Sequence, residues 1–366
     1  MRKYFNYHRE RYDEEFNNLV DGALELARTT FEGKKASDYE DKNKTLLEGI
    51  AKFCVTHTPF EALYEDKGLA IFNRPTVTNN SAIRDNFDAI LAQVVTAVVP
   101  EVVNDDFERY VAEIHQVGWG DSARFIIESN DLFKVNQKAE GVRKGVDQPM
   151  YNREYTVNAH QIDINTHIEW YQFASGKMDM GNFALKIARS FEAYIFLKVV
   201  AGMTSAMTKF GAGYRANGVT PTLWGNLKQK VSAANGGMNV IAIGTEVALS
   251  NAYQGNATNM FGVAIGGEMN AKGYLGEYLG VNLIALKNVL VPGTTNTTNP
   301  QLVLPDDIIY FIPVGGDKPV KIVFEGDEVS VAYDPLNTSD MRLGLTISLH
   351  VGLGIVCGRK FGCIDL

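Results

Sequence analysis

One stretch of the chain, Lys177 to Lys209, has helical periodicity from end to end. At 1.5 Å per residue such a helix would be roughly 50 Å long, about the width of a whole domain of this size. The other elements of the fold must therefore lie along it. Apolar or small residues recur there in steps of three or four, which predicts a core stripe on one face: Ala184, Ala188, Phe191, Ile195, Val199, Met203 and Ala206.

The exposure of this helix is expected to change along its length. Its first turns carry a polar face, whereas the residues from Ala193 to Val200 are apolar nearly all round, interrupted by Lys198. The helix should therefore start half exposed and end buried. The uncharged run between Glu192 and Lys198 is far shorter than the roughly 20 residues that a bilayer requires, so we expect no membrane span.

The net charge and the number of cysteines limit the class of protein to which the chain can belong. The chain has 366 residues, a net charge of −8 and a pI of about 5.4, which disfavours tight, sequence-independent binding of nucleic acid. The length predicts about two domains. The segment from Met1 to Asp21 shows no secretory signal. Three cysteines without a CxxC pair predict free thiols in a reducing compartment, rather than a disulfide framework or a zinc site.

A polar segment separates two β-type runs, Leu132 to Val135 and Tyr155 to Trp170. In the second run the apolar parity changes near His160 and Gln161, which predicts a bulge or a strong twist. The connecting tip is polar on both faces, and a two-stranded arm without a core is barely stable in water. We therefore expect this hairpin to lie on another surface. An ordinary flexible surface loop is the alternative.

Helices and short strands are predicted on either side of these features. Before the hairpin we expect helices over residues 12–32 and 46–53, a helix from Ser81 that stops near Pro100, and a first strand over residues 123–128. After the long helix, Thr220 should cap a helix. Alternating helices and strands then indicate a compact α/β domain: strands at 238–243 and 281–286, helices at 245–253 and 269–279. The closing strands are predicted at 308–313, 320–324, 328–331, 341–349 and 352–357.

No set of residues has the spacing of a catalytic or metal site. The glycine-rich run from Gly211 to Ala216 follows a helix, where a dinucleotide fingerprint needs a preceding strand, so we expect a helix terminator there. His160 and His167 should face opposite sides of a regular strand, and Cys54 with His57 lacks two further metal ligands. We expect no enzyme activity, no cofactor and no metal.

Three stretches look like capsid sequence: Val117 to Ser122, Lys177 to Lys209, and Pro305 to Ile312. With the order of parts around them, the chain resembles the HK97-fold major capsid proteins of tailed bacteriophages. The resemblance implies an α+β fold with an N-terminal arm, an extended β-hairpin loop, a long spine helix in a peripheral domain, and an α/β axial domain. The resemblance implies an N-terminal arm over residues 1–70, followed by the first part of the peripheral domain over 71–122 and the hairpin loop over 123–170. The peripheral domain with the spine helix would follow over 171–219, and the axial domain over 220–322. Residues 323–355 would form the peripheral strands, and residues 356–366 would return to the axial domain.

The resemblance also implies a function. Members of this family are major capsid proteins that self-assemble into pentamers and hexamers of an icosahedral head around a double-stranded DNA genome. The implied location is the virion capsid, and the host cytoplasm during assembly. The implied partners are further copies of the chain, scaffolding, portal and decoration proteins, and loosely contacted DNA, without a membrane. Two alternatives stay open: an encapsulin-like nanocompartment shell, and an α/β enzyme with a site in residues 220–290.

Two sets of residues are candidates for contacts between copies. The hairpin should supply intersubunit ion pairs: Glu140, Arg143, Lys144 and Arg153. The N-terminal arm should supply aromatic contacts: Tyr4, Phe5, Tyr12 and Phe16. Some proteins of this fold cross-link a hairpin lysine to an asparagine of a neighbour. Here no motif singles out a lysine or an asparagine, so a solvated or salt-bridged tip is expected: the available residues are Lys134, Lys138, Lys144 and Asn337.

Overall fold

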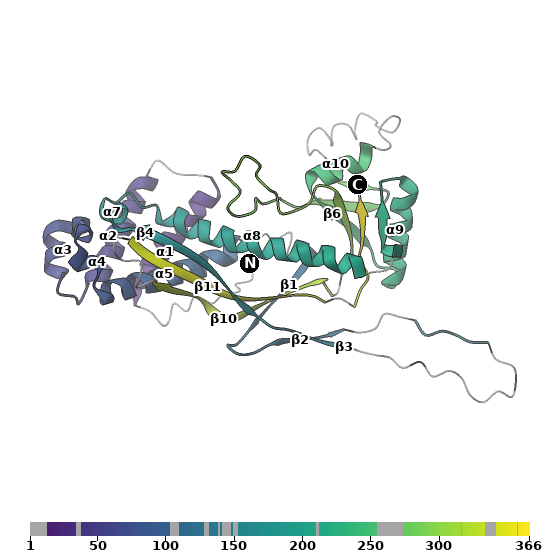
Figure 1. Ribbon diagram of the computed structural model, residues 1–366, viewed down its shortest axis with the longest axis horizontal. Coiled ribbons are helices and arrows are strands. Elements are labelled where there is room, and N and C mark those ends of the chain that lie inside the picture. The colour runs from purple at the N-terminus through teal and green to yellow at the C-terminus, as the bar shows by residue number, and fades with distance from the viewer. Residues whose placement is uncertain are drawn as a thin grey trace.

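Helix α8, Met180–Lys209, runs along most of the body of the molecule and connects its two ends (Figure 1). The structure is a computed structural model that describes residues 13–33, 38–102, 110–127, 132–137, 140, 148, 153–209, 212–254, 274, 276–315, 317–333, 342–356 and 358–366. Helices gather at one end, a six-stranded sheet forms much of the other, and a four-stranded sheet lies along α8. This mixture confirms the predicted α+β class.

The predicted core stripe of α8 is confirmed. Ala184, Phe191 and Val199 are each at most 2% exposed, and the other stripe residues are buried or half-buried. The trend in exposure differs from the prediction, because the N-terminal helices cover the first turns of α8. Positions 201, 204, 205 and 208 near its C-terminal end are exposed instead.

The N-terminal helices belong to the main hydrophobic core. Helices α1 (Glu14–Phe31) and α2 (Tyr39–Val55) pack on each other, and both contact α8 and α5 (Ser81–Val102). Seven residues of α1 are buried. The described part of residues 1–70, the segment that the resemblance assigns to an N-terminal arm, therefore packs into the body of the molecule. Short elements complete this end of the molecule: α3 (Glu61–Lys67), η2 (Gly68–Asn73), α4 (Pro75–Thr78) and α7 (Trp170–Ala174).

A polar network fixes the beginning of α8 against α2. The Tyr39 hydroxyl donates to Asp179 Oδ1 at 2.6 Å, and the same oxygen accepts the backbone N–H of Asn182 at 2.9 Å. Burial, with the hydrogen bond to Asp179, raises the pKa of Tyr39 to about 12. The buried Asn43 donates to the carbonyl oxygen of Met178 at 2.7 Å. Asp179 thus caps α8, since its carboxylate binds one of the free N–H groups of the first turn.

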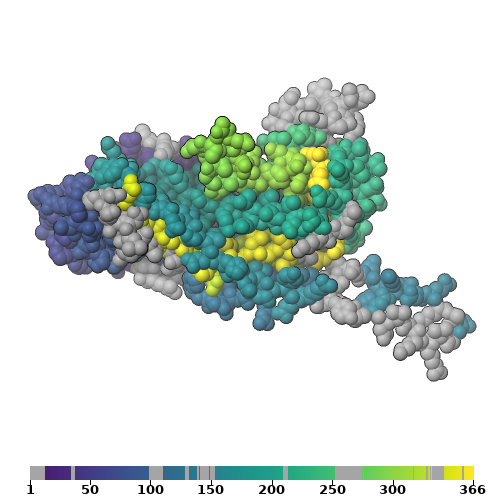
Figure 2. Space-filling model, in the orientation of Figure 1, coloured from purple at the N-terminus to yellow at the C-terminus, as the bar shows by residue number. Residues whose placement is uncertain are grey.

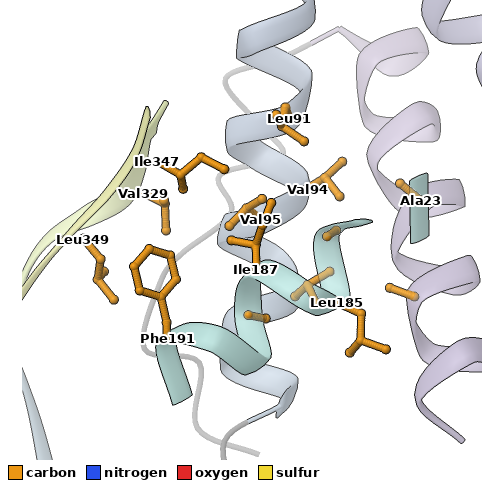
Figure 3. Packing of buried hydrophobic residues seen from close by; sticks show 14 of the residues in the cluster. Ala23, Leu91, Val94, Val95, Leu185, Ile187, Phe191, Val329, Ile347 and Leu349 are labelled. Atoms are coloured by element: carbon orange, nitrogen blue, oxygen red, sulfur yellow. The ribbon is translucent and has the colours of Figure 1, made fainter. Parts of the chain in front are cut away.

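The four-stranded sheet has the strand order β1, β10, β11, β4. Strand β1 (Ala112–Val117) is parallel to β10 (Val320–Tyr333), whereas β11 (Arg342–Ile355) is antiparallel to both β10 and β4 (His160–Glu169). Figure 3 shows Phe191 of α8 beside Val329, Ile347 and Leu349 of this sheet, with side chains of α5 behind it. The sheet therefore has one face packed on helices, and its other face carries the hairpin.

The six-stranded sheet has the strand order β5, β12, β9, β6, β8, β7. Its strands are β5 (Arg215–Asn217), β6 (Val240–Gly244), β7 (Glu277–Tyr278), β8 (Val281–Ala285), β9 (Ile308–Pro313) and β12 (Gly362–Asp365). Helix α9 (Pro221–Ala234) buries Trp224 against Phe311, with the ring centroids 4.7 Å apart. The predicted cap is confirmed, because Thr220 Oγ1 accepts the N–H of Leu223 at 3.2 Å. Helix α10 (Glu246–Gln254) and the short helix η3 (Ala212–Tyr214) complete the helical elements of the described residues.

The closing strands are longer than predicted. Two predicted pairs of short strands are the single strands β10 and β11, each of 14 residues. Gly326 has φ +86° and lies where the register shifts, so it forms a bulge rather than a turn. A Cβ at Gly352 would lie 2.5 Å from the carbonyl oxygen of Asn158, so this glycine permits the close approach of two backbone segments.

Three further predictions need correction. Helix α5 continues through Pro100 to Val102, and β1 precedes the strand that was expected to be first. Within the predicted helix 269–279, residues Glu277 and Tyr278 form strand β7, while most of that range lies outside the described residues.

Candidate assembly surfaces

A two-stranded hairpin leaves the four-stranded sheet and projects past the six-stranded end of the molecule (Figures 1 and 2). Strand β2 (Ala123–Ile127) pairs antiparallel with β3 (Arg153–Val157), with Phe125 opposite Tyr155. Next in the chain, β4 pairs with β11 instead, so the strand changes sheets between Val157 and His160. This change explains the switch of apolar parity in the sequence. We call residues 128–152, which connect β2 to β3, the arm.

The described part of the arm exposes large apolar side chains. Leu132 is 93% exposed, Phe133 is 58% exposed and Val135 is 97% exposed. The backbone between these residues is held by the side chain of Gln148, which accepts a hydrogen bond from the N–H of Lys134 at 2.7 Å and donates one to the carbonyl oxygen of Lys134 at 2.8 Å. Adjacent exposed apolar residues of this kind mark interaction surfaces.

The base of the hairpin is fixed to the sheet by a small apolar cluster. Ala123 and Val157 pack with Val323 and Val356 of the body. The Phe125 ring meets His115 edge to face at 4.9 Å, and Lys321 Nζ lies 5.4 Å from the same ring centroid. The arm therefore begins from a packed root.

A charged network lies beneath Phe125. The Lys321 side chain is 3% exposed and donates to Glu113 and to Asp317. Burial opposes ionisation of Lys321, but the hydrogen bonds to Asp317 and Glu113 outweigh burial and raise its pKa above the ordinary value. Burial alone would raise the pKa of Glu113, yet the hydrogen bond from Lys321 and its charge prevail and lower it. Both groups are thus charged at neutral pH.

A tight turn joins β1 to β2 on the same face. Trp119 is 62% exposed, but its ring lies 5.1 Å from that of His350. A Cβ at Gly326 would lie 2.5 Å from the Trp119 ring, so the bulge glycine leaves space for the indole. The N–H of Gly120 donates to Glu325 Oε1 at 2.7 Å. The segment from Val117 to Ser122 therefore orients the hairpin through contacts with β10 and β11.

The structure locates only some of the predicted contact residues. Arg153, opposite Ile127, and Glu140 are both exposed. Phe16 is 4% exposed and packs against Phe53 of its own chain, with ring centroids 5.5 Å apart, so it is a core residue. Five predicted contact residues lie outside the described residues: Tyr4, Phe5, Tyr12, Arg143 and Lys144. The same holds for two further residues considered for cross-linking, Lys138 and Asn337.

The described residues contain no constellation for metal chemistry. No group of three or more His, Cys, Asp and Glu side chains among them could hold a metal ion. His160 and His167 are both exposed on β4. Burial raises the pKa of the Cys54 thiol above its ordinary range, which keeps it protonated. Of the helices within the described ranges, none has the length and apolar character needed to cross a membrane.

The structure combines a long helix, two sheets and a projecting hairpin. The sequence matches the model of one family, described as "SPbeta prophage-derived putative capsid protein YonB", over residues 15–365. The chain belongs to this family. The predicted capsid protein is thereby confirmed, and the match favours neither an encapsulin-like shell nor an α/β enzyme. No curated protein matches the chain.

Several solved structures are similar to this chain. A Microbacterium phage Oxtober96 structure is 12% identical, with a TM-score of 0.45, and the match covers 72% of this chain and 91% of that one. The capsid of Cyanophage P-SCSP1u is 13% identical, with a TM-score of 0.42 and coverages of 69% and 86%. A virus-like particle from Pyrococcus furiosus is 10% identical, with a TM-score of 0.44 and coverages of 76% and 99%. These likenesses are weak, and the family membership rests on the sequence match.

Proposed function

We propose that this protein is the major capsid protein of an icosahedral phage head and self-assembles into pentamers and hexamers around double-stranded DNA. The observation that carries the proposal is the arm, on which Leu132 and Val135 are more than 90% exposed. Apolar side chains gain roughly 1.5–3 kcal/mol each when they leave water. The arm has no described surface of its own chain to cover them, so further copies are the natural cover. Membership of a capsid family supports this proposal.

The protein would act as a structural component of the virion and not as an enzyme. Its copies would collect in the host cytoplasm, where scaffolding, portal and decoration proteins would join them. The net charge of −8 suits a shell that encloses DNA without binding it tightly. The predicted ion pairs of Glu140, Arg143, Lys144 and Arg153 would add orientation to the apolar contact, since exposed pairs contribute about 0–1 kcal/mol each.

Electron microscopy of the purified protein tests the proposal. The wild-type chain should form closed shells or capsomers, whereas Leu132→Ser combined with Val135→Ser should abolish closed shells. Because both side chains are exposed, the double variant should keep the melting temperature of the unassembled subunit. Asn136→Ser with Gln137→Ser is the matched control, since it changes two exposed polar residues of the same arm. A wild-type protein that stays a monomer at every concentration would refute the proposal.

A further inference from the structure

We propose that the outer edge of β4 pairs with β4 of a second copy, so that two four-stranded sheets continue into each other across a two-fold axis. The proposal deepens the proposed function and rests on it for the place of this contact in a shell. Strand β4 ends the strand order, and no other strand of the described residues lies along its outer edge. The backbone N–H and C=O groups on that edge are therefore open to a partner strand.

The edge formed by β4 is long. Strand β4 has ten residues, whereas the edge strands of the six-stranded sheet, β5 and β7, have three and two. Natural proteins commonly protect exposed edges by keeping them short or by placing lysine, proline or a bulge on them. Strand β4 has none of these, because its register with β11 is continuous and its sequence HQIDINTHIE contains no lysine and no proline. Such an edge is suited to the addition of a strand.

The polar face of β4 is complementary to itself in one antiparallel register. With Asn165 opposite Asn165 of the second copy, Asp163 lies opposite His167, and Gln161 lies opposite Glu169. Within the described ranges, the side chain of His167 has no hydrogen-bond or ion-pair partner in its own chain. Among the antiparallel registers of β4 with itself, this one alone places both carboxylates of the strand opposite side chains that can donate a hydrogen bond.

The other face of β4 is apolar in the same register. Ile162 lies opposite Ile168 of the second copy, and Ile164 lies opposite Thr166. Ile162 and Ile164 are half-buried in the subunit, where they pack against the main core. A partner strand would cover their remaining surface and so extend the core across the axis.

The contact would be isologous, because each copy contributes the same residues. The two strands overlap over residues Gln161 to Glu169. Since alternate residues of an antiparallel strand direct their N–H and C=O groups to one edge, this overlap would form about eight backbone hydrogen bonds. An icosahedral shell contains two-fold axes, and a contact of this symmetry can lie on them.

Cysteine substitutions test the register. Asn165→Cys should give disulfide-linked dimers under mild oxidation, because the two Cβ atoms would lie about 5 Å apart across the axis. Asp163→Cys alone and His167→Cys alone should give none, since each position would be roughly 13 Å from its own counterpart. Mixing these two proteins before assembly should produce the dimer. Wild-type protein gives the baseline, because Cys54 and Cys363 are buried.

The outcomes separate this contact from the proposed function. Linked dimers of Asn165→Cys, with none from Asp163→Cys alone, support the contact whether or not shells form. Shells without these links would overturn it, since a different segment or protein would then cover β4. Equal links at both positions would overturn it as well. Protein that forms the expected links but never forms shells would refute the proposed function instead.

Asn165→Glu supplies a measurement that does not depend on oxidation. It places two carboxylates opposite each other at the axis, close to Asp163 of both copies, and like charges in that position are destabilising. The concentration needed for shell formation should rise at least fivefold, whereas the control Asn165→Ser should change it less than twofold. Because Asn165 is exposed, neither variant should unfold the subunit, which its melting temperature checks. Equal assembly of the two variants would refute the pairing.

Discussion

The contact between α8 and α1 leaves no room for a single methyl group. A Cβ at Gly181 would lie 2.8 Å from the carbonyl carbon of Leu26 and 2.9 Å from the backbone nitrogen of Ala27. Both atoms are backbone atoms of α1, so no side chain can rotate away. Gly181→Ala should therefore push α1 away from α8, close to the hydrogen bond from Tyr39 to Asp179.

The cost can be estimated from two opposing effects. Overpacking a core by a methyl group costs about 1–3 kcal/mol. Replacing glycine by alanine in a helix returns up to about 1 kcal/mol, and less in the first turn, where Gly181 lies. We expect Gly181→Ala to lower the free energy of unfolding by about 1–2 kcal/mol.

Gly225 provides the control for this experiment. It lies within α9, and an added Cβ would meet no heavy atom within 4 Å. Gly225→Ala should therefore raise the free energy of unfolding by up to about 1 kcal/mol. Urea titration of the unassembled subunit, followed by circular dichroism, measures both values. Equal effects of the two substitutions would refute the claim that backbone contact with α1 distinguishes them.

Two further predictions concern buried charge. Burial, helped by Asp85, raises the pKa of Asp88 to about 7, so the folded subunit keeps a proton that the unfolded chain loses near pH 4. Stability should fall as pH rises from about 4 to 7, by up to roughly 4 kcal/mol, and urea titration of Asp88→Asn across that range should show a flatter dependence; an unchanged slope would contradict it. Lys321→Met should cost about 1–2 kcal/mol, because it leaves the half-exposed carboxylates of Glu113 and Asp317 without their partner. Faster amide exchange in β2 than in β6 would locate the loss at the hairpin root, whereas uniform change would contradict it.

The periodicity of the sequence correctly predicted the helices and strands that keep one face buried along their whole length. The stripe of α8 and the apolar strand β9 follow directly from their patterns, and Thr220 acts locally through its own hydroxyl. The continuity of β10 was not predictable, because Gly326 with Asp327 has the composition of a turn and only tertiary pairing makes it a bulge. The extent to which α1 is buried also depends on tertiary packing. Its buried face includes Asn17, which hydropathy assigns to solvent.

The arm could be predicted from the sequence as a segment without a core, but not its contact residues. The sequence emphasised its charged tip, whereas the structure draws attention to the exposed side chains of Leu132, Phe133 and Val135, which the sequence indicated only as a β-type run.

The hairpin combines a rigid root with an uncovered end, and this combination has an energetic consequence. Binding by a segment that must first be ordered loses about 0.5–1.5 kcal/mol for each side chain that is fixed. At the root, Phe125 rests over Lys321, and the Gly120 N–H holds Glu325, so the direction of the hairpin is set before any partner arrives. The Gln148 side chain similarly closes on the backbone of Lys134. The free energy gained by covering Leu132 and Val135 is then available to hold copies together rather than to orient the root of the hairpin.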